Sequence, residues 1–193
     1  MSTTATQPMD RALTMNCLFS QYVTEWAVPL HRGTEALMRL GSWLNRLKPG
    51  DALYVEHGMP YDADTGLFVH APIEVRVCDS TVHTSPDRNN RPYLDSTVKD
   101  GPTLNINAIM YRPYDRDPAQ LRRWFDAFEW LMRDLGGKPH WAKNFAATKR
   151  ELEQWYGDDL EQWRRVRREC DPDGLFVAPW HLKHVIEDGT GID

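Results

Sequence analysis

The distribution of apolar residues along the chain predicts three β-strands. Residues 16–30 are rich in aromatic and β-branched side chains and end near Pro29, and residues 104–114 form a similar stretch. Between them, residues 67–77 alternate between a polar and an apolar face. The polar face carries His70, Glu74 and Arg76. The apolar face, which we expect to lie in the core, carries Val69, Ala71, Ile73, Val75 and Val77.

Apolar residues at helical spacing predict several helices. Thr34 is expected to cap a helix whose apolar residues recur three and four positions apart as far as Leu47. Asp117 and Pro118 predict the start of a second helix, and the glycine pair at 136–137 predicts its end. The sequence TKRE at 148–151 is a capping box, after which two short helices are expected.

These elements predict an α+β fold, with a mainly antiparallel sheet covered by helices and a C-terminal helical tail. Their spacing is too irregular for repeated βαβ units. Residues 1–14 are expected to form a disordered leader, and residues 15–193 a single domain. The polar stretch at 85–103 shows no periodicity, so we expect a mobile loop, a lid or an insertion there.

Composition narrows the possible classes of function. The net charge of −5 does not favour binding to nucleic acid or to an anionic membrane. No apolar run approaches the roughly 20 residues of a membrane span, and the N-terminus lacks a secretory signal. The widely spaced Cys17, Cys78 and Cys170 argue against a disulfide framework or a zinc site and favour a reducing compartment. Eight tryptophans could line a ligand site, although packing in the core is the more common use.

Two groups of charged residues could carry chemistry. Glu74 and Arg76 leave the same face of a strand about 7 Å apart. Such a pair can also be an ordinary surface ion pair without a function, since exposed pairs are common and contribute little to stability. Lys143 lies between Trp141 and Phe145, and these flanks would desolvate its ammonium group and make it a precise hydrogen-bond donor. The alternative is a lysine whose stem packs on the indole while its head stays in water.

The histidines suggest a metal site only weakly. His181 and His184 fit one helix face and His140 could join them, but no neighbouring Cys or carboxylate completes the set, so we expect no metal. The sequence also contains no GxGxxG, GxxxxGK[ST] or GxSxG motif. It therefore offers no self-contained cradle for nucleotide phosphates.

Five segments are diagnostic when taken in order: CLFSQYVTEWAVPL, HAPIEVRV, NINAIMYRPY, GGKPHWAKNF and DPDGLFVAPWH. Together they resemble the C-terminal part of the D-arabinono-1,4-lactone oxidase family, among the vanillyl-alcohol-oxidase-type flavoenzymes, and especially its fungal members. The resemblance covers nearly everything from about Met15 onward. It implies oxidation of an aldonolactone at the hydroxyl carbon next to the carbonyl, with hydride transfer to FAD and electrons to oxygen, giving hydrogen peroxide. The sheet would then be that of the cap domain of these enzymes.

The resemblance also implies how the chain would hold its substrate. Glu74 and Arg76 match an ExR pair that faces the flavin in family members. Arg76 would hold substrate oxygens and stabilise negative charge, and Glu74 would accept a hydrogen bond from a hydroxyl or act as a base. Asn105 and Asn107 could add polar contacts from the neighbouring strand.

Cofactor contacts are implied in the same way. Lys143 matches the lysine of an HWxK motif near the reactive edge of the isoalloxazine, where it would tune the reduced flavin. His140 and Trp141 would shape the wall beside it and help to exclude water.

The sequence departs from the family at one large point, because it contains no FAD-binding domain. We therefore expect that half to be supplied elsewhere, whether the chain is a fragment, a truncated paralogue or one subunit of a split enzyme. The Trp-rich stripes are expected to form an exposed apolar face towards that half. The alternative is a non-enzymatic remnant that binds a sugar lactone or a protein partner. By resemblance the expected location is a mitochondrial membrane, otherwise the cytoplasm, and not the secreted space.

Overall fold

The computed structural model describes residues 6, 8, 19–62, 67–69, 73–79, 91–99 and 101–186, so most of the predicted leader lies outside it. In chain order the elements are β1 (Ser20–Pro29), η2 (Leu30–Arg32), α1 (Gly33–Leu44), β2 (Glu74–Cys78), β3 (Thr103–Arg112), η4 (Pro113–Asp115), α2 (Leu121–Asp134), β4 (Lys138–Pro139), α3 (Lys149–Tyr156), α4 (Asp158–Cys170) and α5 (Pro179–His184). The strands form an antiparallel sheet in the order β2-β3-β1-β4. The predicted α+β fold and helical tail are confirmed.

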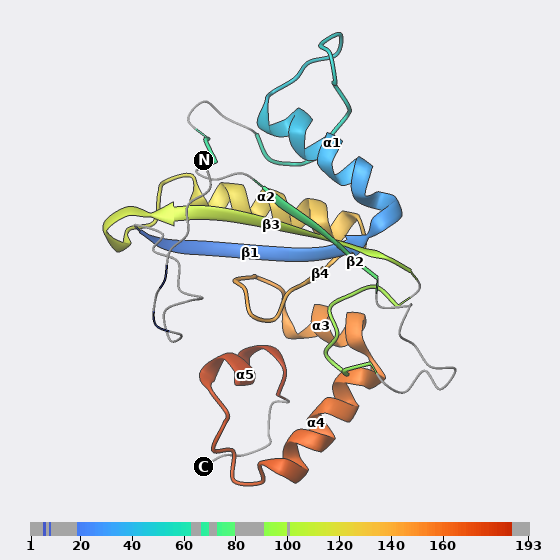
Figure 1. Ribbon diagram of the computed structural model, residues 1–193, viewed down its shortest axis with the longest axis vertical. Helices are drawn as coiled ribbons and strands as arrows, with labels where there is room; N and C mark the ends of the chain where they lie inside the picture. Colours follow the sequence, from blue (N-terminus) through green and yellow to red (C-terminus); the bar gives the residue numbers. More distant parts are fainter. Residues whose placement is uncertain are drawn as a thin grey trace.

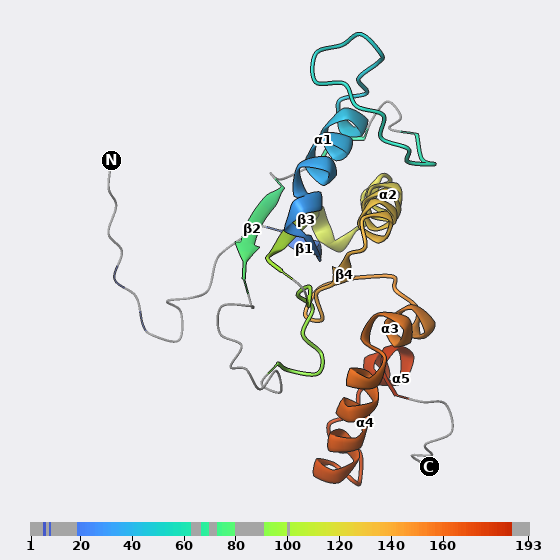
Figure 2. The ribbon, with the colours of Figure 1, turned by 90° about the vertical axis from the view of Figure 1, so that its right-hand side faces the viewer.

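The sheet separates an apolar layer from a polar one. Helices α1 and α2 pack on one face, and α3 to α5 lie beyond the β4 edge (Figures 1 and 2). The side chains turned towards α1 and α2 are almost completely buried: Trp26, Val28, Leu104, Ile106, Ala108 and Met110. Because side chains alternate along a strand, the residues between them, such as Glu25 and Asn107, belong to the opposite face.

Tryptophan forms the centre of the core. Trp26, Trp43 and Trp124 are fully buried, and the rings of Trp43 and Trp124 stack with centroids 6.1 Å apart. The expectation that the Trp-rich stripes are exposed is therefore wrong for α1 and α2, because these helices and the sheet bury the rings against one another, whereas Trp155 and Trp163 in the helical tail are partly buried. The large apolar side chains that are exposed include Leu175 and Phe176, in the turn between α4 and α5.

The predicted burial of the second strand is also wrong in part. Val75 and Val77 are 39% and 61% exposed, whereas Val69 and Ile73 pack against the core and Ala71 lies outside the described residues. The reason is that β2 is an edge strand, placed on the side of the sheet away from α2 (Figure 2). Alternation predicts which side chains share a face, but it does not show how far the covering helices extend.

Two predicted helix starts are displaced. Helix α1 begins directly after the turn η2, so its N-cap is Arg32 and Thr34 lies inside the helix. Helix α2 begins at Leu121, later than expected, and Asp117 pairs with Arg112 instead of capping the helix. The predicted stop at 136–137 is confirmed, since α2 ends just before it.

The predicted capping box and the two short helices after it are confirmed. Thr148 Oγ1 accepts a hydrogen bond from the Glu151 amide, and the Glu151 carboxylate accepts one from the Thr148 amide. Across the described part of the chain, each helix is too short or too polar to span a bilayer.

The tight contact at Gly137 yields a test of the fold. A Cβ there would lie 2.8 Å from Met132 O and 2.9 Å from Val28 Cγ1, so we expect Gly137→Ala to lower the free energy of unfolding by about 1–3 kcal/mol. Gly41→Ala is the control, because a Cβ in that part of α1 meets no atom within 4 Å and should stabilise the helix by about 1 kcal/mol. Urea unfolding of both variants measures the difference. Equal stabilities would contradict the close approach of strand and helix end.

Candidate functional site

Charged and amide side chains gather on the sheet face opposite α1 and α2. The strand register places Glu74, Asn107 and Glu25 in one row across β2, β3 and β1. The next row holds Arg76 and Asn105, with Ala27 on β1. Because neighbouring strands lie about 4.8 Å apart, each row spans about 10 Å.

Arg76 reaches across β3 to a carboxylate on β1. Its Nη2 donates to Glu25 Oε1 at 2.7 Å, while its Nε lies 3.4 Å from Glu74 Oε1. Glu25 is 2% exposed, whereas the side chains of Arg76 and Glu74 are 54% and 52% exposed. The face therefore holds a buried acid beneath a half-exposed guanidinium and a second, half-exposed acid.

The two asparagines of β3 share the predicted face but differ in accessibility. Asn107 is buried and donates from Nδ2 to Glu25 Oε2 at 3.2 Å. Its Oδ1 is buried and has no hydrogen-bond partner in the described part of the chain. Asn105 is half-buried and donates to Cys78 Sγ at 3.1 Å. Of the two, Asn105 is the more accessible to a ligand.

The HWAKN loop, residues 140–144, runs along the β1 edge that β4 leaves free. The His140 amide donates to Glu25 O at 2.9 Å, and the Asn144 amide donates to Val23 O at 2.8 Å. His140 therefore stands three strand positions from Glu74, about 14 Å away. Within the loop, the Lys143 amide donates to His140 O at 3.1 Å and closes a turn.

This arrangement brings the predicted substrate residues together and places the predicted cofactor residues across β1 from them. Lys143 is half-buried, and its ammonium group has no ion pair or hydrogen bond to any described residue. Glu74 and Arg76 line one side of the polar face, and the loop lines the other. A cavity of about 500 Å³ lies elsewhere, at the end of β1, lined by Pro29, Leu30, His31, Val98, Lys99, Gly101 and Pro102.

Trp141 anchors the loop to the helical tail. Its Nε1 donates to Leu94 O at 2.7 Å, and its ring contacts those of Phe145, Tyr156 and Trp180. These contacts explain the bulk of the loop, because aromatic rings supply a large buried area in a fixed geometry. The predicted contact of Trp141 with flavin stays a prediction.

Glu129 on α2 holds the backbone two residues beyond the same loop, at Ala146. Both of its carboxylate oxygens accept from the Ala146 amide, at 3.1 and 3.2 Å, and Arg133 Nη1 donates to it at 3.1 Å. Burial raises the pKa of the Glu129 carboxyl, and Arg133 opposes that rise. The loop is therefore fixed at both ends, by β1 and by α2.

Lys138, on β4, lies opposite Ala27 and so shares the face of Arg76 and Asn105, although its ammonium group packs on an aromatic ring of the helical tail. Its Nζ lies 4.8 Å from the centre of the Tyr156 ring. Burial lowers the pKa of Lys138, and the nearby cations Lys99 and Arg91 lower it further. Burial likewise raises the pKa of the Tyr156 hydroxyl.

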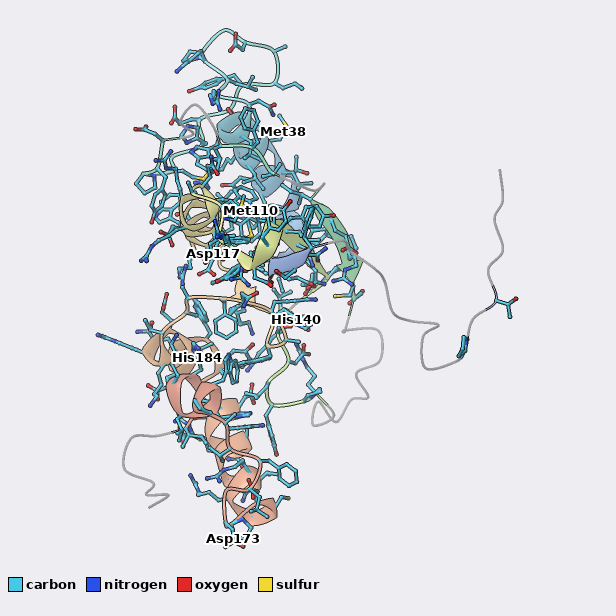
Figure 3. All side chains as sticks on the ribbon, turned by 90° about the vertical axis from the view of Figure 1, so that its left-hand side faces the viewer. Met38, Met110, Asp117, His140, Asp173 and His184 are labelled. Atoms are coloured by element: carbon cyan, nitrogen blue, oxygen red, sulfur yellow. The ribbon has the colours of Figure 1, made fainter. Side chains whose placement is uncertain are left out.

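The three histidines considered for a metal site make separate contacts. His140 Nδ1 accepts from the Ala142 amide, and His181 Nδ1 accepts from the Ala178 amide. His184 is buried among the C-terminal helices, with Nδ1 3.2 Å from Ala147 O, while His140 lies nearer the sheet (Figure 3). Among the described residues, no three His, Cys, Asp or Glu side chains form a group that could hold a metal ion.

Comparison with known proteins shows the family of the chain. Residues 1–184 match the family model for D-arabinono-1,4-lactone oxidase. The chain belongs to the D-arabinono-1,4-lactone oxidase family. A protein of Neurospora crassa named "Putative D-arabinono-1,4-lactone oxidase" is 60% identical over 95% of this chain and 33% of its own length. The D-arabinono-1,4-lactone oxidases of Yarrowia lipolytica and Eremothecium gossypii are 32% and 34% identical over 90% and 98% of the chain. The chain spans 33–42% of the length of these three relatives.

Within this member of the lactone oxidase family, Glu25 is the residue of the polar face that sequence reasoning missed. A signal for it exists, since Glu25 is an acid in the middle of the apolar stretch YVTEWAV. A carboxylate in a buried strand needs a donor on a neighbouring strand, because an unpaired buried charge is very costly. The same alternation that puts Glu74 and Arg76 on a polar face could therefore have directed attention to this position.

Buried His184 should make folding depend on pH. Burial, and then Lys183, lowers its pKa below the ordinary 6.5, so below about pH 6.5 the unfolded chain binds a proton that the folded chain does not. We expect the free energy of unfolding of the wild type, relative to that of His184→Gln, to decrease as the pH falls from 7.5 to 5. Chemical unfolding at each pH measures it, with Val185→Ala, a buried non-titrating neighbour, as the pH-independent control. A constant difference for His184→Gln would contradict the assignment.

Proposed function

We propose that this chain is the substrate-side part of an FAD-dependent aldonolactone oxidase acting on D-arabinono-1,4-lactone. The observation that supports it is the grouping of Glu74, Arg76 and Asn105 on one polar sheet face, with the Lys143 loop across β1. Membership of the family supports the class of substrate. The net reaction removes a hydride and a proton from the carbinol next to the lactone carbonyl, and oxygen takes up both with their electrons as hydrogen peroxide.

The described residues fit the ring of a flavin but not its phosphates. Lys143 is a partly exposed cation without a described partner, so it could donate to an electron-rich ring edge. The sequence has no Gly-rich motif that could bind the phosphates. The part that this chain matches is 33% of the Neurospora crassa relative, so about two thirds of that relative is additional chain. We therefore assign the remainder of FAD binding to a part of the enzyme that corresponds to that additional chain. When bound, FAD would supply the hydride acceptor.

Arg76 is the residue that would bind the substrate. Its guanidinium is planar and always charged, and the N–H groups not directed at Glu25 or Glu74 can donate to lactone oxygens. These donors would also stabilise the oxygen of the alcohol as it loses its proton. Glu74, half-exposed beside Arg76, would accept a hydrogen bond from that hydroxyl or take its proton.

The groups on this face suit a polyhydroxylated ligand. Glu25 and Glu74 are carboxylates, Arg76 is a guanidinium, and the cations Lys138 and Lys143 lie on or beside the same face. A polyhydroxylated lactone offers both donors for Glu74 and acceptors for Arg76.

The test is a chimera in which this chain replaces the matching third of the Neurospora crassa relative. We expect a bound-flavin absorption band and peroxide production that depends on D-arabinono-1,4-lactone. Arg76→Lys should lower kcat/KM by about 10²–10³-fold, because lysine lacks the planar fork of donors. Arg122→Lys, on an exposed side chain of α2, is the control and should leave turnover unchanged. Full activity of Arg76→Lys would contradict the role given to Arg76, and absence of lactone-dependent peroxide in the unmodified chimera would contradict the function.

A further inference from the structure

The position of Glu25 calls for a physical explanation. It lies in the middle of β1, directly opposite Asn107, which is itself directly opposite Glu74. It is almost fully buried, although a carboxylate is among the most costly groups to remove from water. A residue that served only to fill the sheet would be apolar at this position.

Both oxygens of Glu25 are used, and by residues of two different strands. Oε1 accepts from Arg76 Nη2 on β2 at 2.7 Å, and Oε2 accepts from Asn107 Nδ2 on β3 at 3.2 Å. A distance of 2.7 Å is typical of a strong charge-assisted hydrogen bond. One buried carboxylate thus fixes both the guanidinium and the amide on the polar face.

The contact between Arg76 and Glu74 is much weaker by the same measure. Its 3.4 Å lies beyond the usual hydrogen-bond range, and both side chains are half-exposed, where ion pairs contribute about 0–1 kcal/mol. Arg76 therefore keeps its orientation through Glu25 when Glu74 moves. Glu74 can turn towards a ligand without releasing the guanidinium.

We propose that Glu25 is a positioning residue of the lactone site: it holds Arg76 and Asn107 in place and thereby leaves the Glu74 carboxylate free for a substrate hydroxyl. This inference rests on the proposed function and adds different roles for the Glu25 and Glu74 carboxylates. Without Glu25, Arg76 would turn to Glu74, its remaining acidic partner among the described residues, and that pair would occupy both groups that the substrate needs. The catalytic contacts belong to Glu74 and Arg76, while Glu25 acts through them.

Kinetics of the chimera provide the first arm of the test. Glu25→Gln keeps the size of the side chain but presents an amide –NH2 to one of its two donors, so we expect kcat/KM to fall about 100-fold, as for a small misplacement of a binding group. Added to Arg76→Lys, the same change should cost little further activity, because its effect passes through Arg76. Independent, multiplicative losses would overturn the proposal. Glu153→Gln is the matched control, since it removes a carboxylate from Arg164 in the helical tail and should leave kcat and KM unchanged.

The second arm needs no activity and does not disturb the buried acid. In the isolated chain carrying Glu74→Gln, NMR should show that rotation of the Arg76 guanidinium about Cζ–Nη2 stays as slow as in wild type, because Glu25 still holds it. Fast rotation in Glu74→Gln would mean that Glu74 is the holder, and the proposal fails. If Glu25→Gln does not fold, this arm decides alone. If the unmodified chimera oxidises no lactone, the proposed function fails, and the guanidinium measurement still decides whether Glu25 is the residue that holds Arg76.

Discussion

The register of β3 between β1 and β2 is the constraint on which the rest of the structure depends. Leu104, Ile106, Ala108 and Met110 all point towards α1 and α2 and are buried, so a slip by one residue would expose this apolar set. The same register places Asn107 between Glu25 and Glu74. Hydrophobic burial on one face therefore determines which polar groups meet on the other, and the Glu25–Asn107 hydrogen bond reinforces the alignment.

The opposite side of the site depends on backbone pairing followed by aromatic packing. Strand β4 is only two residues long, but the amides of His140 and Asn144 continue its pairing with the carbonyls of β1. The rings of Trp141 and Phe145 then attach the loop to Tyr156 of α3 and Trp180 of α5. In this way the tail helices position the loop that carries Lys143, and the need for large rings in so short a connection follows from this geometry.

Local signals in the sequence predicted the features that depend on local physics. The antiparallel sheet, the helix end at Gly136 with its positive φ of 74°, and the capping box at Thr148 all follow from residue type and spacing. The exposure of Val75 and Val77 could not be predicted, since it depends on where the covering helices stop. The start of α1 was misplaced because the turn η2 runs directly into the helix ahead of Thr34, and that of α2 because Asp117 pairs with Arg112 instead of capping the helix. Strand alternation predicted that Glu74 and Arg76 share a face, whereas their position beside Asn105 and Glu25 depends on the register of three strands.

The burial of Glu25 beneath a half-exposed Arg76 argues for a ligand site and not for an ion pair that serves only to stabilise the sheet. Replacing a buried ion pair by well-packed apolar residues is often neutral or stabilising, by as much as about 1–4 kcal/mol. A valine at position 25 would avoid the desolvation of a carboxylate and would suit a strand that already contains Trp26, Ala27 and Val28. What the carboxylate adds is a fixed orientation for a guanidinium that remains half in solvent. Such an arrangement stabilises the fold poorly, but it presents a rigid, charged donor to a ligand at little further entropic cost when the ligand binds.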